Sequence, residues 1–192
     1  MAYIGQKPAN KAVVADDLDP AVITGQTALA VAPADTDEFL ISDAGVLKRL
    51  DASLIGGDNT PAFRVSGPNT SCANNTFVKL SVNAETFDVG SCFDLGGNNR
   101  FTPNAAGKYV LTARVEMPSG TDTDYLNTVF YKNGSNIGGV AIVQKDWQVA
   151  AFTSIVEANG SSDYFEVYAR QQTGGTENIY LAEFSGFKLI GA

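Results

Sequence analysis

Two aspartates, Asp122 and Asp124, form the pair in this sequence whose spacing best suits a metal ion. They stand in residues 119–124, where Ser, Gly and Thr predict a loop. Carboxylate oxygens are the hard ligands that Ca²⁺ prefers. No EF-hand pattern surrounds them, and a solvated acidic loop is the simpler interpretation. Calcium is therefore the one cofactor candidate, and no other cofactor is indicated.

The two cysteines, Cys72 and Cys92, raise the question of a disulfide. Residues 76–82 and 85–90 predict a hairpin whose turn centres on Asn83 and Ala84. In that register the cysteines lie near each other across the open end of the hairpin, within reach of a bridge. A disulfide would suit a protein that works outside cells, and two free thiols would suit assembly in a reducing cytoplasm. Both alternatives stay open.

Trp147 is the single tryptophan and stands in a predicted loop, residues 144–148. An exposed tryptophan is a frequent anchor of binding sites, so Trp147 and Asp124 are candidates for contact with a ligand. The same indole could instead fold back as a lid over the core. The sequence does not separate these two interpretations.

The chain contains no histidine, which removes Ser-His-Asp and Cys-His sites in their usual form. The acidic residues of the predicted strands, chiefly Glu116, Glu157, Glu166 and Glu183, form no recognisable catalytic pair. We therefore predict that the protein is not an enzyme. A glycan-acting enzyme is kept as a weak alternative.

The formal net charge of −8 disfavours nucleic acid as a partner, because an acidic surface repels phosphate. No apolar run is long enough to span a bilayer, and residues 1–11 lack the apolar segment of a signal peptide. We therefore expect no membrane insertion, and a protein that is cytosolic at synthesis or leaves its cell by another route.

Residues 61–192 read as short strands separated by turn residues, which predicts an all-β sandwich or jelly roll. From Tyr109 to Met117 apolar residues alternate with others, so one face of this strand is fully apolar. The predicted strands are residues 61–66, 76–82, 85–90, 108–117, 125–133, 149–157, 163–172 and 178–190.

Residues 1–57 differ from the remainder, because they lack long alternating strands and hold only two aromatics, Tyr3 and Phe39. A helical turn is predicted after Asp19 and Pro20, a hairpin over residues 38–50, and a short capped turn over residues 51–57. Gly and Asn near residue 57 mark the boundary with the head, residues 58–192. So little apolar material cannot bury a core, so we expect an extended, partly hairpin-forming arm.

The head resembles the globular head of complement subcomponent q, a trimeric jelly roll of the tumour-necrosis-factor superfamily. This resemblance implies a homotrimer, and aromatic strand residues packed in the core or about the trimer axis: Tyr109, Phe130, Phe152, Phe165, Tyr168, Tyr180, Phe184 and Phe187. Some relatives bind calcium at the trimer apex. The matching residues are Phe93, Asp94, Asn99–Pro103, Ala106–Tyr109, Ala113, Val115, Phe184–Phe187 and Leu189.

The arm is similar to the N-terminal parts of fibre and appendage proteins of tailed phages. Residues 33–43, PADTDEFLISD, followed by Leu47, Lys48 and Arg49, carry this similarity, together with the opening MAYIGQKPA. It implies a virion component, such as a short fibre, knob or capsid decoration, whose arm docks on other virion proteins.

Together these features predict a trimeric structural protein of a virion that exposes a jelly-roll head for stabilisation or surface recognition. A glycan on the host surface is the expected ligand for host attachment. The alternative from another class is a secreted binding module like the complement head.

Overall fold

In the computed structural model the described residues are 21–25, 27, 33–34, 36–55, 59–117, 125–142 and 147–190. The chain divides into two compact units, residues 1–56 and 57–192. None of the helices in the described ranges is long and apolar enough to cross a membrane.

The first unit contains the hairpin that the sequence predicts. Ala44 and Gly45 form its turn with φ values of 49° and 82°, as two-residue hairpin turns require. The Gly25 amide donates to the Ala21 carbonyl at 2.9 Å, which closes the predicted helical turn, while Asp19 and Pro20 lie outside the described residues. The elements are α1 (Ala21–Thr24), β1 (Glu38–Asp43), β2 (Val46–Asp51) and the 3-10 turn η2 (Ala52–Leu54).

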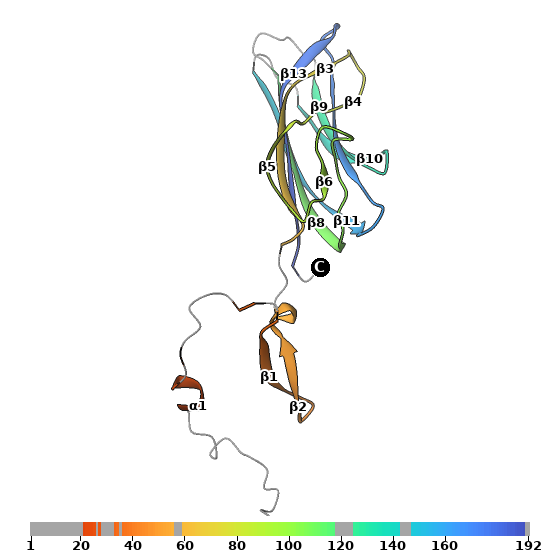
Figure 1. The fold of residues 1–192 in the computed structure, drawn as a ribbon. Helices are drawn as coiled ribbons and strands as arrows, with labels where there is room; N and C mark the ends of the chain where they lie inside the picture. The colour runs from red at the N-terminus through yellow and green to blue at the C-terminus, as the bar shows by residue number, and fades with distance from the viewer. Residues whose placement is uncertain are drawn as a thin grey trace, which may run out of the picture. The chain divides into compact units, whose positions relative to one another are not determined.

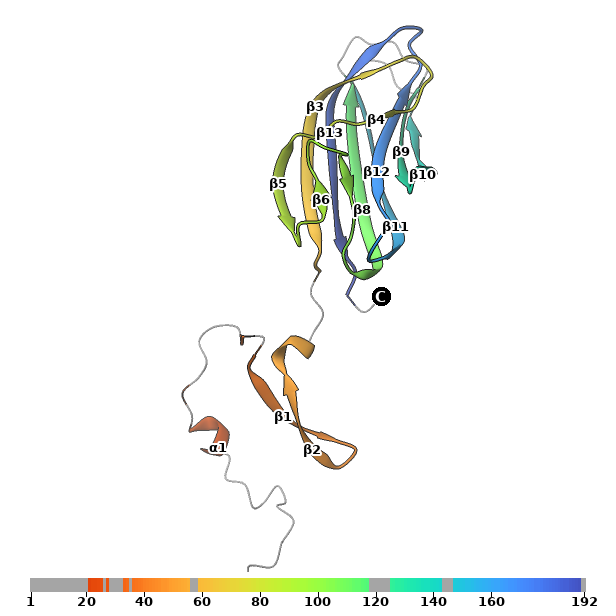
Figure 2. The ribbon, with the colours of Figure 1, turned by 45° about the vertical axis from the view of Figure 1, so that its right-hand side comes forward.

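The second unit is a sandwich of two antiparallel sheets, and the head is therefore an all-β jelly roll, as predicted (Figures 1 and 2). One sheet has the order β11-β8-β13-β3-β5. The other has the order β10-β9-β12-β7-β6, with β4 paired to β12. The strands are β3 (Ala62–Cys72), β4 (Val78–Lys79), β5 (Ala84–Val89), β6 (Phe93–Asp94), β7 (Arg100–Phe101), β8 (Ala106–Met117), β9 (Leu126–Lys132), β10 (Ser135–Ile142), β11 (Gln148–Asn159), β12 (Phe165–Gln171) and β13 (Glu177–Lys188).

Aromatic rings fill the space between the two sheets. Phe63 of β3 is fully buried and lies 4.4 Å from Phe101 and 4.8 Å from Phe184, measured between ring centroids. Phe130 and Phe165 reach this cluster from the opposite sheet. Burial of each ring contributes roughly 2–3 kcal/mol, so this cluster is the main source of cohesion between the sheets.

The sandwich has two ends, which we call proximal, where the head begins, and distal, at the opposite ends of the strands. At the proximal end, the amide of Lys188 donates to the carbonyls of Asn59 and Pro61, so the start and the end of the described head lie together. At the distal end, β3 stops at Cys72, β8 stops at Met117 and β12 stops at Gln171.

The predicted hairpin of residues 76–82 and 85–90 does not form. Val78 and Lys79 pair with β12 in one sheet, whereas β5 pairs with β3 in the other. The chain crosses between the sheets, because the Leu80 amide donates to Val167 and the Asn83 amide donates to Ser66. The absence of a side chain at Gly67 permits this crossing, since a Cβ there would lie 2.2 Å from the Ser81 carbonyl oxygen.

Three strands of the head were not predicted. Strands β6 and β7 have two residues each, too few for a periodic pattern. Strand β10 contains Gly138 and Gly139 and is mostly exposed, so it lacks an apolar alternation.

Candidate interaction surface

The outer side of the five-stranded sheet carries large apolar side chains that no other part of the described chain covers. We call this surface the five-strand face. It is formed by the residues of β5, β3, β13, β8 and β11 that alternate with the buried core positions. Ile155 on the edge strand β11 is 63% exposed, and Val89 at the end of the other edge strand, β5, is 48% exposed.

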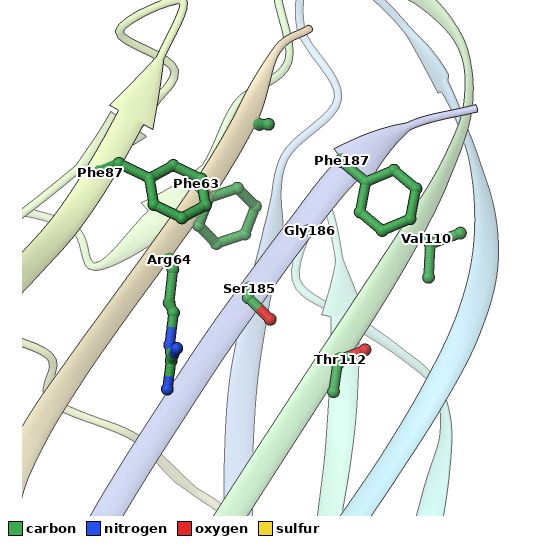
Figure 3. Close-up of a pocket in the computed structure, with 9 residues that line it drawn as sticks. Phe63, Arg64, Phe87, Val110, Thr112, Ser185, Gly186 and Phe187 are labelled. Atoms are coloured by element: carbon green, nitrogen blue, oxygen red, sulfur yellow. The ribbon is translucent and has the colours of Figure 1, made fainter. Parts of the chain in front are cut away.

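The proximal half of the five-strand face is apolar and hollowed. Phe87 and Phe187 are exposed and flank a shallow pocket of about 300 Å³. Figure 3 shows Phe187 beside Val110, with Ser185 and Thr112 next along the same strands. The floor of the pocket is the Phe63 region of the core.

The middle of the five-strand face carries four charges that cancel. Glu183 of β13 lies 3.2 Å from a guanidinium nitrogen of Arg64 and 3.2 Å from one of Arg114. Arg114 also pairs with Glu116 along β8, and Glu116 is almost fully buried. Two guanidinium groups and two carboxylates therefore form a neutral cluster, so the face can be covered without leaving a net charge.

Trp147 lies at the distal end, just before Gln148, which is paired with Met117. Its indole is 41% exposed and meets the ring of Tyr180 edge-on, at 5.6 Å between centroids. Tyr180 is itself half-exposed. Trp147 and Tyr180 thus form an aromatic pair at the surface, and a ligand role for Trp147 stays a prediction.

Asp122 and Asp124 lie outside the described residues, so the calcium prediction also stays a prediction. The structure therefore does not place Asp124 relative to Trp147. In the ranges that are described, no three or more of Cys, Asp and Glu gather as a metal site would require.

Of the two alternatives for the cysteines, the folded chain has the free thiols: Cys72 and Cys92 are both buried and are not bridged. Cys72 ends β3 at the distal end, and Cys92 follows Val89, which pairs with Ala62 at the proximal end. Strand β3 alone separates these positions by about 30 Å, whereas a disulfide needs Cα atoms within about 7 Å. The cysteines do not approach each other because the predicted hairpin does not form.

Sequence reasoning treated the strand aromatics as one set, and the structure divides them. Tyr109, Phe130, Phe165 and Phe184 are buried, and Phe152 packs at the edge of the core. Tyr168, Tyr180 and Phe187 point outward. The alternation of side chains along β13 could have shown this, because Phe187 lies on the same face as the polar residues Glu183 and Ser185.

Comparisons with known proteins show the fold of the head. No protein-family model matches the chain, and no curated protein does. The globular domain of zebrafish complement 1qA protein is 14% identical over 68% of this chain and 98% of its own, with a TM-score of 0.50. Eiger TNF from S. frugiperda is 14% identical over 68% of this chain and 93% of its own, also with a TM-score of 0.50.

A third similar structure is the PRD1 vertex protein P5. It is 14% identical over 69% of this chain and 99% of its own, with a TM-score of 0.51. At these identities the likeness concerns the fold alone, which is a jelly roll of the complement-head and tumour-necrosis-factor type.

Proposed function

We propose that this chain is a non-enzymatic structural and recognition component of a virion, and that its head associates in threes through the five-strand face. The observation that carries the proposal is the exposed apolar half of that face beside a charge cluster that is already neutral. A second protein surface can cover such a face at little electrostatic cost, and water is a poor occupant of its pocket.

Three copies are proposed because the head resembles the complement head in its sequence and has the same type of fold. Association about a three-fold axis buries the same face of every copy and leaves the opposite sheet outside. Strand β10, which lies at the edge of that opposite sheet, stays at the surface of each copy.

Catalysis is not part of the proposal. Glu166 pairs with Lys79 at 3.1 Å, and Glu183 and Glu116 pair with Arg114, so three of the four strand glutamates are held in ion pairs. Glu157 is exposed on β11. This arrangement does not support the alternative of a glycan-acting enzyme.

A virion location is supported by two features of different kinds. The fold of the head is also that of a phage vertex protein, and the arm resembles the N-terminal parts of phage appendage proteins. In this proposal residues 1–57 dock on other virion proteins, and the head faces outward. A secreted module like the complement head is the alternative, and the resemblance of the arm argues against it.

The trimer is tested on the full chain by sedimentation velocity and mass photometry. The wild type is expected at three times the chain mass. The double variant Ile155→Glu with Phe187→Glu places new carboxylates on the five-strand face and is expected to give a folded monomer. Ile137→Glu, at an exposed position on the edge strand β10 of the other sheet, is the matched control and should remain trimeric. A monomeric wild type at micromolar concentration would refute the proposal.

The arm is tested by deletion of residues 1–57 from the gene in its phage. The truncated protein should remain trimeric and should be missing from purified particles. Incorporation of the truncated protein at wild-type level would show that residues 1–57 are not the attachment element.

A further inference from the structure

We propose that the outer side of the six-stranded sheet is a binding site for an acidic polysaccharide whose sugars carry carboxylates. We call this surface the six-strand face; its outward residues alternate with the core positions of β4, β6, β7, β9 and β12. The inference goes beyond the proposed trimer and does not depend on it, because the residues that carry it belong to one chain.

Arg170 of β12 is the centre of the proposed site. Its guanidinium lies 4.7 Å from the ring centroid of Phe77 and 5.0 Å from that of Tyr125. Cation–π contact with the two rings holds the guanidinium in place without any anion. Tyr125 is itself held, because its hydroxyl donates to the side-chain oxygen of Asn75 at 3.1 Å.

Arg170 has no anionic partner among the described residues. None of their carboxylates lies within ion-pair distance of it, although the chain has 21 acidic residues against 13 basic ones. Its Nε atom also lacks a hydrogen-bond acceptor. A guanidinium stacked against rings still offers in-plane N–H groups, and these match the two oxygens of a carboxylate.

Two tyrosines continue the surface along the sheet. Tyr168 lies two residues before Arg170 on the same side of β12, a separation of about 7 Å. Its ring stacks on that of Tyr131 from β9, with 4.0 Å between centroids. Such a pair offers apolar area and two phenol hydroxyls, which suits the C–H surfaces and hydroxyl groups of a sugar ring.

A second guanidinium lies at the other end of the same row. Arg100 of β7 stands over the ring of Tyr164, at 4.6 Å from its centroid. Six residues of nearly extended chain from Tyr164 to Arg170 span about 20 Å, the length of several sugar units. Arg100 also lies opposite Asp94, so Arg170 is the guanidinium that is left for a carboxylate, and the row of tyrosines that leads from it toward Arg100 suits an extended polymer.

The charge balance of this face favours an anion. Its outward charged residues are Lys79, Arg100 and Arg170 against Asp94 and Glu166, which gives +1 (3 − 2) on a chain of −8. Glu166 is paired with Lys79 at 3.1 Å, and Asp94, whose pKa is lowered mainly by hydrogen bonds from Asn98, stays ionised opposite Arg100. Arg170 therefore remains to attract a ligand.

A saccharide fits the six-strand face better than a second copy of this chain does. The five-strand face is hollowed and exposes Phe, Val and Ile side chains, whereas the rings here are only partly exposed and are mostly tyrosines. The site also lies on strands, so its side chains are fixed before a ligand arrives, which lowers the entropy cost of binding.

The test measures binding of a galacturonate oligosaccharide to the full-length protein by calorimetry at low ionic strength. Neutral dextran and poly-glutamate are the comparison ligands. The wild type should bind the galacturonate and should bind neither comparison ligand with similar affinity. Equal binding of dextran would refute a role for charge, and equal binding of poly-glutamate would refute a saccharide site.

Arg170→Gln should weaken binding about tenfold or more, as expected for loss of a charge-assisted contact. Arg170→Lys should recover only part of it, because an ammonium lacks the planar pair of donors. Arg49→Gln removes the same charge at an exposed position of β2, outside both faces of the head, and is the matched control. A loss with Arg49→Gln equal to that with Arg170→Gln would refute the site.

Trp147→Ala separates this site from the distal aromatic pair and should leave galacturonate affinity unchanged. The mass and the thermal unfolding of every variant are measured in the same samples. A monomeric protein that still binds through Arg170 would refute the trimer alone, and a trimer that does not bind galacturonate would refute this inference alone.

Discussion

The two outer faces of the sandwich cover one shared core and carry opposite chemistry. The five-strand face exposes aliphatic and phenylalanine side chains, and the four charges at its middle cancel within the chain. The six-strand face holds tyrosines and keeps Arg170 against rings rather than carboxylates. A sheet fold requires only that inward positions be apolar, so the outward positions are free to differ according to what each face meets.

This difference separates two kinds of partner. Apolar area with internally neutral charge favours permanent burial, as in the interface between copies of one protein. A cation left without a carboxylate in an acidic chain, as Arg170 is among the described residues, favours a reversible anionic ligand, whose attraction falls as salt rises. The head can therefore use one face for assembly and the other for recognition.

The largest effect is expected from Phe184→Ala, because both faces depend on the same core. Phe184 is 2% exposed and its ring contacts Phe63, Phe93 and Phe130. Truncation should lower the free energy of unfolding by about 3–5 kcal/mol, and chemical denaturation measures it. Trimer formation and galacturonate binding should then be lost over the same range of denaturant. Loss of one well before the other would show that the faces are supported separately.

A smaller effect is expected from high pH, through Tyr109 under the proximal half of the five-strand face. Burial raises the pKa of Tyr109 to about 12 from an ordinary value of 10, and its hydroxyl donates to the Ala105 carbonyl at 2.6 Å. Because the pKa is higher in the folded chain, this contribution to stability is complete below pH 10 and is lost as pH rises toward 12. The loss should reach about 2–3 kcal/mol.

Tyr109→Phe is the control for that titration. It should cost about 1 kcal/mol at neutral pH through the lost hydrogen bond, and it should flatten the fall in stability between pH 10 and 12. An equally steep fall in the variant would assign the titration to other groups.

Much of the fold was predictable from the sequence, because Tyr109–Met117 of β8 alternate and because β8 and β13 carry many of the residues that resemble the complement head. The crossing of the chain from one sheet to the other at residues 80–83 was not predictable, because an alternation with a period of two does not say which sheet a strand joins. The hairpin predicted in its place also put Cys72 and Cys92 within reach of a bridge, which the structure does not. The six-strand face was missed because Tyr168 was assigned to the core or the trimer axis, although it lies on the same side of β12 as Glu166 and Arg170.

A sharper comparison comes from removing one carboxylate from each face. Glu183→Gln leaves Arg64 and Arg114 short of an anion, so each copy would bring a net positive charge into the proposed interface. The trimer should weaken about tenfold or more. The isolated head should lose at most about 1 kcal/mol, because both arginines are more than a third exposed and water screens the pair.

Glu166→Gln is the matched change on the six-strand face. It removes the carboxylate partner of Lys79 and should leave the trimer mass unchanged. Sedimentation over a range of concentrations compares the two variants. Equal weakening by both would show that the five-strand face is not the interface.

The smallest effect is expected from oxidation of the two thiols. Cys72 and Cys92 lie at opposite ends of the sandwich, so neither face depends on a covalent link between them. Incubation with oxidised glutathione should produce no bridge within the chain, and reduction should change the free energy of unfolding by less than about 0.5 kcal/mol, against the 2–4 kcal/mol typical of a disulfide.

The rate of alkylation completes this last test, because burial raises the pKa of both thiols and only a thiolate reacts readily. Iodoacetamide should therefore modify the native protein slowly and the unfolded chain fast, with two modified cysteines per unfolded chain and no prior reduction. A Cys72–Cys92 peptide pair in a digest of the native protein would require β3 and β5 to pair in another register. The assignment of outward residues to the five-strand face follows from that register and would then be wrong as well.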